Sequence, residues 1–431
     1  MRLTGVRAVP GFALGTLGRS GRRWNHDQRR RCGSRRTTAL GYVAVLAVVL
    51  CACGTSPSTQ RGSRHERTST AASPTAPAPA TSAPAGSSGV SPTASTSPTS
   101  YAGATWSEQT VPSGVGYLQS VTCPTAADCY AVGGKEYGSG PGWIVASSDG
   151  GDSWRLLDTT PATGLAAVTC PNAQTCIAVG GSLAVSGTVP DALVTTDGGH
   201  VWSKVTVPAQ VGGLSDIACM STTRCITVGG GSAMALTTDG GRTWTTENLP
   251  SGFATVDSVT CPTSAFCLLG GSGPGPGATS PSMDSVTHNG GASWSAAAVV
   301  GGASALGQVS CSNATDCVGI IASDATDTYG TGTPIVTTDG ASTWQPVSTT
   351  VGGSVSCVQH FCVSAGATYQ AARGFRAAAF VSTDGGLQWT PMSVSASQGL
   401  EAVTCHSSAD CLAVGGNFPA NTTAMILTYR S

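Results

Sequence analysis

The residues best suited to binding a ligand form one short run near the C-terminus, Tyr369-Gln370-Ala371-Ala372-Arg373-Gly374-Phe375-Arg376. Guanidinium groups pair with carboxylates through two parallel hydrogen bonds, and aromatic rings offer flat apolar surfaces to sugars. We therefore take Tyr369, Arg373, Phe375 and Arg376 as candidate residues for binding a carboxylate or a sugar. The alternative is that this run is a solvated loop whose charges only serve solubility.

A second candidate cluster is Lys135, Glu136 and Tyr137. Glycosidases need two carboxylates at a defined separation. Glu136, Asp324 and Asp327 could supply such a pair, but their spacing in the sequence gives it no support. The histidines are scattered and mark neither a catalytic triad nor a metal site: His200, His288, His360 and His406. We expect no catalytic residue, no cofactor and no metal.

The cysteines after residue 100 fall into seven pairs, and most pairs enclose five residues that form a short polar turn. The pairs are Cys123/Cys129, Cys170/Cys176, Cys219/Cys225, Cys261/Cys267, Cys311/Cys317, Cys357/Cys362 and Cys405/Cys411. Facing residues of a β-hairpin lie within disulfide range, and an exported protein meets an oxidising compartment. We therefore predict seven disulfides, each within one hairpin. The alternative is metal binding, which needs four convergent ligands.

The elements that must position these residues are repeats. An eight-residue run of the form Ser/Thr-x-Asp-Gly-Gly-x-x-Trp, here called the box run, occurs six times with small departures. The copies are 147–154, 195–202, 237–244, 287–294, 337–344 and 382–389. Its hydroxyl and carboxylate can bond local backbone groups, and its glycines supply positive φ. With Trp106, the recurring tryptophan marks seven units of the size of a four-stranded propeller blade.

The two ends of the repeat region complete each other. The run 106–111 matches an outermost strand with no box before it, and the run 424–429 matches a third strand that stops where a box should begin. Together they make one blade. We therefore predict an all-β, seven-bladed β-propeller of four-stranded blades over residues 104–431, closed by the N-terminal strand, with one disulfide per blade.

The box run resembles the Asp-box of BNR-type β-propellers, a group that includes sialidases, sortilin-like receptor domains and photosystem assembly-factor propellers. In these families the box is a turn on the rim, away from the ligand. The resemblance implies that box turns and cysteine turns share one face, and that ligands bind at the other face, near the channel mouth. Sialidase chemistry would need three convergent arginines and a Phe-Arg-Ile-Pro run. That run is absent, and only Arg373 and Arg376 are expected on the binding face.

Residues 1–53 have the pattern of an export signal: an Arg-rich stretch, then an apolar run at 39–50. Leu50-Cys51-Ala52-Cys53 resembles a bacterial lipobox, of the type found in actinobacterial lipoproteins, with Cys53 as the lipidated residue. An ordinary secretory signal is the alternative. Residues 54–103 are rich in Ser, Thr, Pro and Ala and predict a disordered tether.

Residues 101–431 carry eight Lys and Arg against 20 Asp and Glu, which argues against nucleic acid as a partner. We therefore expect a monomeric propeller anchored by lipid to the outer face of the cytoplasmic membrane. Its expected function is non-catalytic, as a binding or scaffold module for a protein or glycan of the cell envelope. The alternative is a sialidase-like glycoside hydrolase that acts on extracellular glycans.

Overall fold

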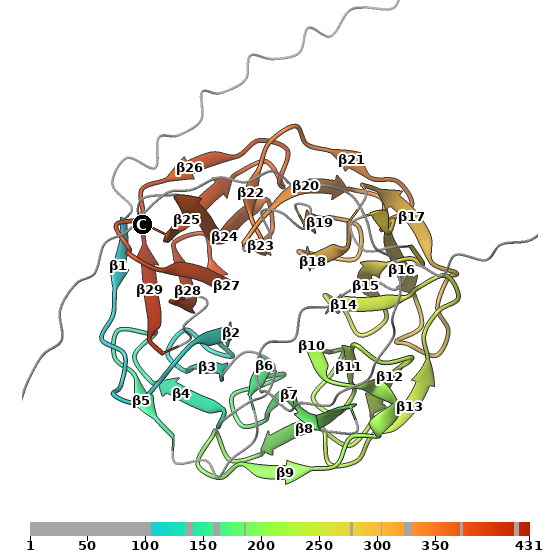
Figure 1. The fold of residues 1–431 in the computed structure, drawn as a ribbon, viewed down its shortest axis with the longest axis horizontal. Helices are drawn as coiled ribbons and strands as arrows, with labels where there is room; N and C mark the ends of the chain where they lie inside the picture. Colours follow the sequence, from blue (N-terminus) through green and yellow to red (C-terminus); the bar gives the residue numbers. More distant parts are fainter. Residues whose placement is uncertain are drawn as a thin grey trace, which may run out of the picture. The chain divides into compact units, whose positions relative to one another are not determined.

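The computed structural model describes residues 105–134, 141–157, 164–184, 187–275, 279–302, 304–322, 330–370, 374–417 and 422–431. These residues form seven antiparallel sheets arranged as blades around a central axis (Figure 1). The prediction of an all-β, seven-bladed propeller is confirmed. The expected signal, Cys53 and the tether lie outside the described residues. No helix within the described ranges is long and apolar enough to cross a membrane.

Each blade has four strands, which lie side by side in order from the axis to the rim. The innermost strands are β2 (Leu118–Thr122), β6 (Leu165–Thr169), β10 (Leu214–Cys219), β14 (Thr255–Thr260), β18 (Leu306–Cys311), β23 (Ser354–Val358) and β27 (Gly399–Ser407). The second strands are β3 (Cys129–Gly133), β7 (Cys176–Ala184), β11 (Cys225–Gly229), β15 (Cys267–Ser272), β19 (Cys317–Ala322), β24 (Phe361–Gln370) and β28 (Asp410–Gly416).

The outermost strand of each blade has only two to four residues. The third strands are β4 (Trp143–Ser147), β8 (Gly187–Thr195), β12 (Ala233–Thr237), β16 (Ser282–Thr287), β20 (Thr331–Thr337), β25 (Gly374–Ser382) and β29 (Ala424–Arg430). The outermost strands are β5 (Arg155–Leu156), β9 (Ser203–Val205), β13 (Thr245–Asn248), β17 (Ala298–Gly301), β21 (Gln345–Pro346), β26 (Thr390–Met392) and β1 (Thr105–Glu108). A short strand, β22 (Val351–Gly352), adds to β20, and η2 (Ala209–Val211) is a single 3-10 turn. Short outer strands leave little unpaired edge exposed.

The hydrophobic core lies between the blades. Seven clusters of buried side chains each draw on two neighbouring blades, and one of them joins Leu118 and Val121 of the first blade to Leu412 and Ile426 of the last. A single blade would expose both of its apolar faces. The ring therefore buries every face, which is why repeats of this kind need one another.

The predicted closure of the ring is confirmed. β1 pairs antiparallel with β29, with Trp106 opposite Tyr429. In Figure 1 the blue β1 lies beside the red β29. Beyond the strand, the Gln109 N–H donates to the Ile426 carbonyl at 2.9 Å. The last blade is thus built from both ends of the repeat region.

The box runs form the expected turns. In the first, the Ser147 hydroxyl accepts the Gly151 N–H at 2.8 Å, and the Asp149 carboxylate accepts the Ser153 N–H at 2.9 Å. Asn289 replaces the aspartate in the fourth box run, yet its side-chain oxygen accepts the Ser293 N–H at the same 2.9 Å. An amide therefore preserves this turn, because only one oxygen is needed for the backbone bond.

All seven predicted disulfides are confirmed, with S–S distances of 2.00–2.15 Å. Each links the first strand of a blade to the second. In the third blade, for example, Cys219 faces Cys225 directly across the strand pair.

Candidate functional site

The propeller has two unlike faces, because the disulfide turns and the box turns lie together. The first glycine of each box donates its N–H to a carbonyl of the disulfide turn in the same blade, as Gly150 does to Ala127 at 2.8 Å and Gly240 does to Thr223 at 2.8 Å. We call this side the box face. The loop face, at the other end of the strands, carries the turns between second and third strands and the connections between blades.

The candidate aromatic residues lie on the loop face, on a long hairpin of the sixth blade. This hairpin is formed by β24 and β25, of ten and nine residues. Tyr369 faces Phe375 across the strand pair, with ring centroids 5.2 Å apart, and 62% of Tyr369 is exposed. A Cβ on Gly399 would approach the Cβ of Ala367 to 2.9 Å, so the hairpin packs closely on the start of β27. The aromatic pair is therefore carried by a hairpin that packs closely against the last blade.

Arg376 is not brought together with the aromatic pair. It faces Thr368 in the strand register, and alternation along the strand places it on the opposite side of the hairpin from Phe375. One guanidinium nitrogen, Nη1, donates to the Ser397 carbonyl at 2.9 Å. This guanidinium thus holds the connection to the next blade. Arg373 lies outside the described residues, as do Lys135, Glu136, Tyr137, Asp324 and Asp327.

β-Bulges at the loop-face end of six inner strands were not anticipated from the sequence. The register shifts by one residue within β2, β6, β10, β14, β18 and β27. The extra residues are Gln119, Ala166, Ser215, Asp257, Gly307 and Glu401. Bulges redirect side chains and often lie beside functional sites. The bulged position holds a different residue in each of these otherwise similar strands. This variation was the signal in the sequence that could have revealed the bulges.

Two of the bulged residues are acidic. The Tyr117 hydroxyl donates to the Glu401 carboxylate at 2.5 Å, across the boundary between the last blade and the first. Asp257 lies in the fourth blade, and burial raises the pKa of its carboxyl to about 6. No Lys or Arg occurs in any of the seven inner strands as the structure describes them. The bulged positions of the described inner strands therefore carry two carboxylates and no Lys or Arg.

Asp216 has an altered pKa for a structural reason. Its two carboxylate oxygens accept the N–H of Ile217 at 2.8 Å and the N–H of Val259, in the next blade, at 2.9 Å. In the first blade a serine makes the equivalent bond to the next blade, because the Ser120 hydroxyl accepts the Val168 N–H at 3.2 Å. Burial outweighs these bonds and raises the pKa of Asp216 to about 6. This carboxylate joins the third blade to the fourth.

The Asp284 carboxylate also has a structural role. Burial raises the pKa of its carboxyl to about 6, and it accepts the indole N–H of Trp344 from the neighbouring blade at 2.8 Å. The pKa values of four box aspartates, Asp149, Asp197, Asp239 and Asp339, are lowered instead. Hydrogen bonds from Ser153 and Ser147 lower the pKa of Asp149 to about 2. Each of these carboxylates stabilises a turn or a blade interface.

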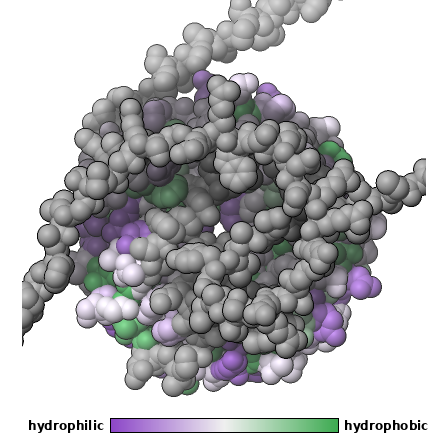
Figure 2. All heavy atoms as spheres, viewed as in Figure 1, coloured by the Kyte–Doolittle hydropathy of each residue, from purple (hydrophilic) through white to green (hydrophobic). Residues whose placement is uncertain are grey.

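Among the described residues there is no group of three or more His, Cys, Asp or Glu side chains able to hold a metal ion. A shallow hollow lies on the box face between the last blade and the first, lined by Cys123, Gly150, His406 and Asp410 among others. It is remote from Tyr369. In Figure 2 the coloured residues mix hydrophilic and hydrophobic types without a broad apolar patch.

No protein-family model matches the chain, and no curated protein matches it. Solved structures match through the fold. YCF48 bound to a D1 peptide gives a TM-score of 0.53 at 15% identity, covering 76% of this chain and 97% of that chain. The U3-55K structure gives 0.53 at 8% identity, covering 75% and 98%. The GH74 xyloglucanase from Xanthomonas campestris gives 0.53 at 14% identity, covering 75% of this chain and 53% of that one.

Proposed function

We propose that this chain is a non-catalytic binding module of the cell envelope, which presents its loop face to a protein or glycan partner. The observation that carries the proposal is the exposed Tyr369 ring, supported by Phe375 on a long, closely packed hairpin. Rigid aromatic side chains of this kind dominate binding energies, because little conformational entropy is lost when they are covered.

The structural hydrogen bonds of the buried aspartates favour binding over catalysis as the function. Asp216 and Asp284 accept backbone and indole N–H groups at blade interfaces, and burial at these interfaces raises the pKa of both carboxyls. The fold neighbours include proteins described with protein or peptide partners, such as YCF48 with a D1 peptide. Peptides are therefore the first class of ligand to test.

The location is proposed from the sequence. The Arg-rich stretch, the apolar run and Cys53 favour export and lipid attachment, and the box runs favour membership of the Asp-box superfamily. A lipid-anchored propeller on a tether of about 50 residues would reach partners well away from the membrane surface.

The binding proposal is tested on peptide and glycan arrays with the purified chain and two variants. Tyr369→Ala should weaken any specific binding at least tenfold, since loss of an interface hot spot costs on the order of 2 kcal/mol. The matched control is Val299→Ala, because Val299 is 66% exposed but lies on the outer strand β17. Equal effects of the two changes, or no effect of either, would contradict this surface.

The anchor is tested by cell fractionation. Cys53→Ala should release the chain from membranes, because the thiol that receives the lipid is gone. Cys51→Ala is the matched control and should leave membrane retention unchanged. Retention of the Cys53→Ala chain would exclude this residue as the anchor.

A glycoside hydrolase is the second candidate, and Asp257 is the observation in its favour. A carboxyl with a pKa of about 6 is suited to general acid catalysis near neutral pH. The test is release of reducing sugar from envelope polysaccharides by the chain and by Asp257→Asn. We expect no turnover by either. Turnover that Asp257→Asn abolishes would replace the binding proposal.

A further inference from the structure

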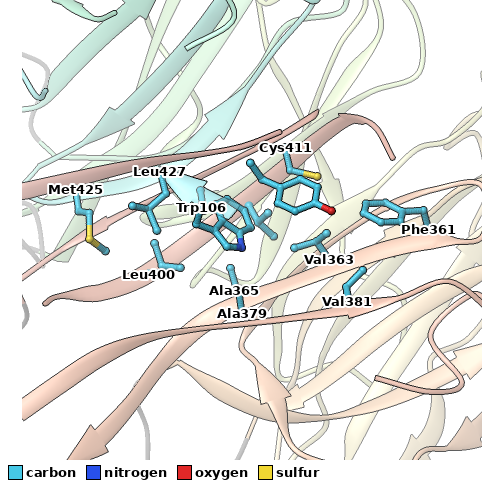
Figure 3. Close-up of a cluster of buried hydrophobic side chains, with 13 residues drawn as sticks. Trp106, Phe361, Val363, Ala365, Ala379, Val381, Leu400, Cys411, Met425 and Leu427 are labelled. Carbon is cyan, nitrogen blue, oxygen red and sulfur yellow. The ribbon is translucent and has the colours of Figure 1, made fainter. Parts of the chain in front are cut away.

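The outermost position of the last blade is a slot filled by a strand from far away in the sequence. Trp106 is only 6% exposed and lies among side chains of the sixth and seventh blades, including Leu400, Met425 and Leu427 (Figure 3). Its ring centroid is 5.5 Å from that of Tyr429. The slot thus recognises β1 through one deeply inserted aromatic residue.

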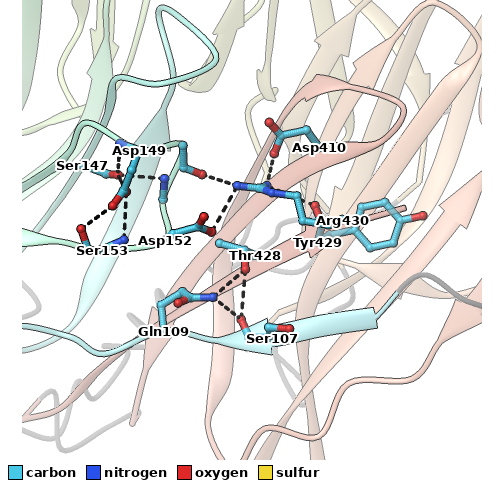
Figure 4. Close-up of polar contacts among 12 residues, drawn as sticks. Ser107, Gln109, Ser147, Asp149, Asp152, Ser153, Asp410, Thr428, Tyr429 and Arg430 are labelled. Atoms are coloured by element: carbon cyan, nitrogen blue, oxygen red, sulfur yellow. Dashed lines mark hydrogen bonds and ion pairs between the residues drawn. The ribbon is translucent and has the colours of Figure 1, made fainter.

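Polar groups fix the register of β1 in this slot. The Gln109 side-chain amide donates to the Thr428 hydroxyl at 2.7 Å (Figure 4). The Gln109 backbone N–H donates to the Ile426 carbonyl at 2.9 Å. At the other end, Arg430 bonds Asp410 and the Gly150 carbonyl, so β29 stays in place independently of β1. The slot is therefore shaped by β29 and its neighbours.

β1 differs from the six other outermost strands in its covalent attachment. Each of those strands follows the third strand of its own blade through a box turn, so it cannot leave its blade. β1 instead pairs with the last blade but is followed in the chain by the segment 109–117, which leads to β2 of the first blade. That segment has a turn in which the Val115 N–H reaches the Pro112 carbonyl at 3.4 Å, and Gly114 adopts a φ of 86°. A change at this turn would free β1 without disturbing another strand.

We propose that β1 is exchangeable between copies of this chain, so that β1 of one copy fills the slot of a second copy. The exchanged pair would repeat every contact of the closed monomer, and its only costs are association and a rearranged turn. A short connection gives the strand an effective concentration on the order of millimolar towards its own slot. The monomer therefore prevails in dilute solution, and exchange becomes appreciable where chains are crowded.

The experiment mixes two single-cysteine variants, Thr105→Cys and Ser431→Cys, in a background with Cys32, Cys51 and Cys53 changed to Ala. Thr105 faces Arg430 in the strand register, so residues 105 and 431 are neighbours and both are exposed. A short bis-maleimide can link the two variants only when β1 of one lies beside β29 of the other. We expect about 1% covalent heterodimer at 10 μM chain and tens of per cent at 1 mM.

The matched control replaces Ser431→Cys with Ser395→Cys, which is also exposed but follows β26. A second arm unfolds the oxidised mixture in urea and refolds it at 1 mM, so that slow opening of the native ring cannot hide the exchange. Heterodimer above the Ser395→Cys background in either arm supports the proposal. Heterodimer at background in both arms overturns it.

Discussion

Aspartates of this propeller titrate in two opposite senses, according to where their carboxyl groups lie. Burial raises the pKa of Asp216, Asp257 and Asp284 to about 6. Hydrogen bonds from the serines of the first box turn lower the pKa of Asp149 to about 2. A raised carboxyl pKa favours the folded state at lower pH, whereas a lowered one favours it at higher pH.

The free energy of unfolding should therefore have its maximum near pH 4. As the pH rises from about 4 to 7, the buried aspartates ionise at a cost and stability falls. As the pH falls from about 4 to 2, the bonds of Asp149 are lost and stability falls again. Urea midpoints measured from pH 2 to 8 check this, and Asp257→Asn should reduce the decline above pH 4. A curve that rises steadily from pH 4 to 7 would contradict the assignment.

The second position of the box turn favours glycine for two reasons. Gly241 has a φ of 87°, and a Cβ there would lie 2.8 Å from Cδ1 of Ile177 in the preceding blade. Ala341 occupies the same place in the fifth box run with a φ of 66°. A left-handed conformation costs a non-glycine residue roughly 1 kcal/mol.

Ala341→Gly should therefore raise the free energy of unfolding by up to about 1 kcal/mol. The reverse change, Gly241→Ala, should lower it by more than that, since overpacking adds to backbone strain. Urea titration of the two variants checks both signs. A loss of stability in Ala341→Gly would show that the methyl group contributes more packing than the backbone strain costs.

At the scale of the element, each hairpin disulfide closes a small loop. Cysteines only six positions apart restrict the unfolded chain modestly, so one disulfide should contribute about 2 kcal/mol. We expect Cys219→Ala/Cys225→Ala to lower stability by that amount. The same double change at Cys357 and Cys362, in a blade that is not adjacent, should add to it within about 0.5 kcal/mol. A markedly larger combined loss would mean that the blades do not contribute independently.

The inner strands show how neighbouring elements compensate for one another. In the second blade Ala167 offers no acceptor to the Ile217 N–H of the third blade. Asp216 bonds that N–H with one oxygen and the Val259 N–H of the fourth blade with the other. A carboxylate with two oxygens thus replaces two serines, which explains why a buried charge is retained in an apolar interface.

At the scale of the whole molecule, the position of β1 makes the chain cross the boundary between the last blade and the first. Separating these blades requires both loss of their apolar contact and withdrawal of Trp106 from its slot. A circular permutant of residues 109–431, two glycines and residues 104–108 would make the last blade continuous. Its ring could then open by loss of the apolar contact alone.

We expect this permutant to fold as the same propeller and to melt several degrees below the parent chain. Amide hydrogen exchange should increase first at β2 and β28, on the two sides of the boundary. Differential scanning calorimetry and hydrogen exchange check the two expectations. A permutant that melts at the parent temperature would show that β1 adds nothing to ring closure.

The sequence by itself determined the repeat, the blade count, the disulfide pairs and the closure by β1, because each depends on contacts within one hairpin or on matching strand patterns. It also located Tyr369 and Phe375 together. Only the tertiary structure decided the bulges of the inner strands, the separation of Arg376 from the aromatic pair and the commitment of Asp216 to two blades. The commitment of Asp216 depends on its contact with Val259, 43 residues further along the chain, which exists only after neighbouring blades have packed. The bulges and the side on which Arg376 lies depend on the exact strand register, which the residue pattern does not specify.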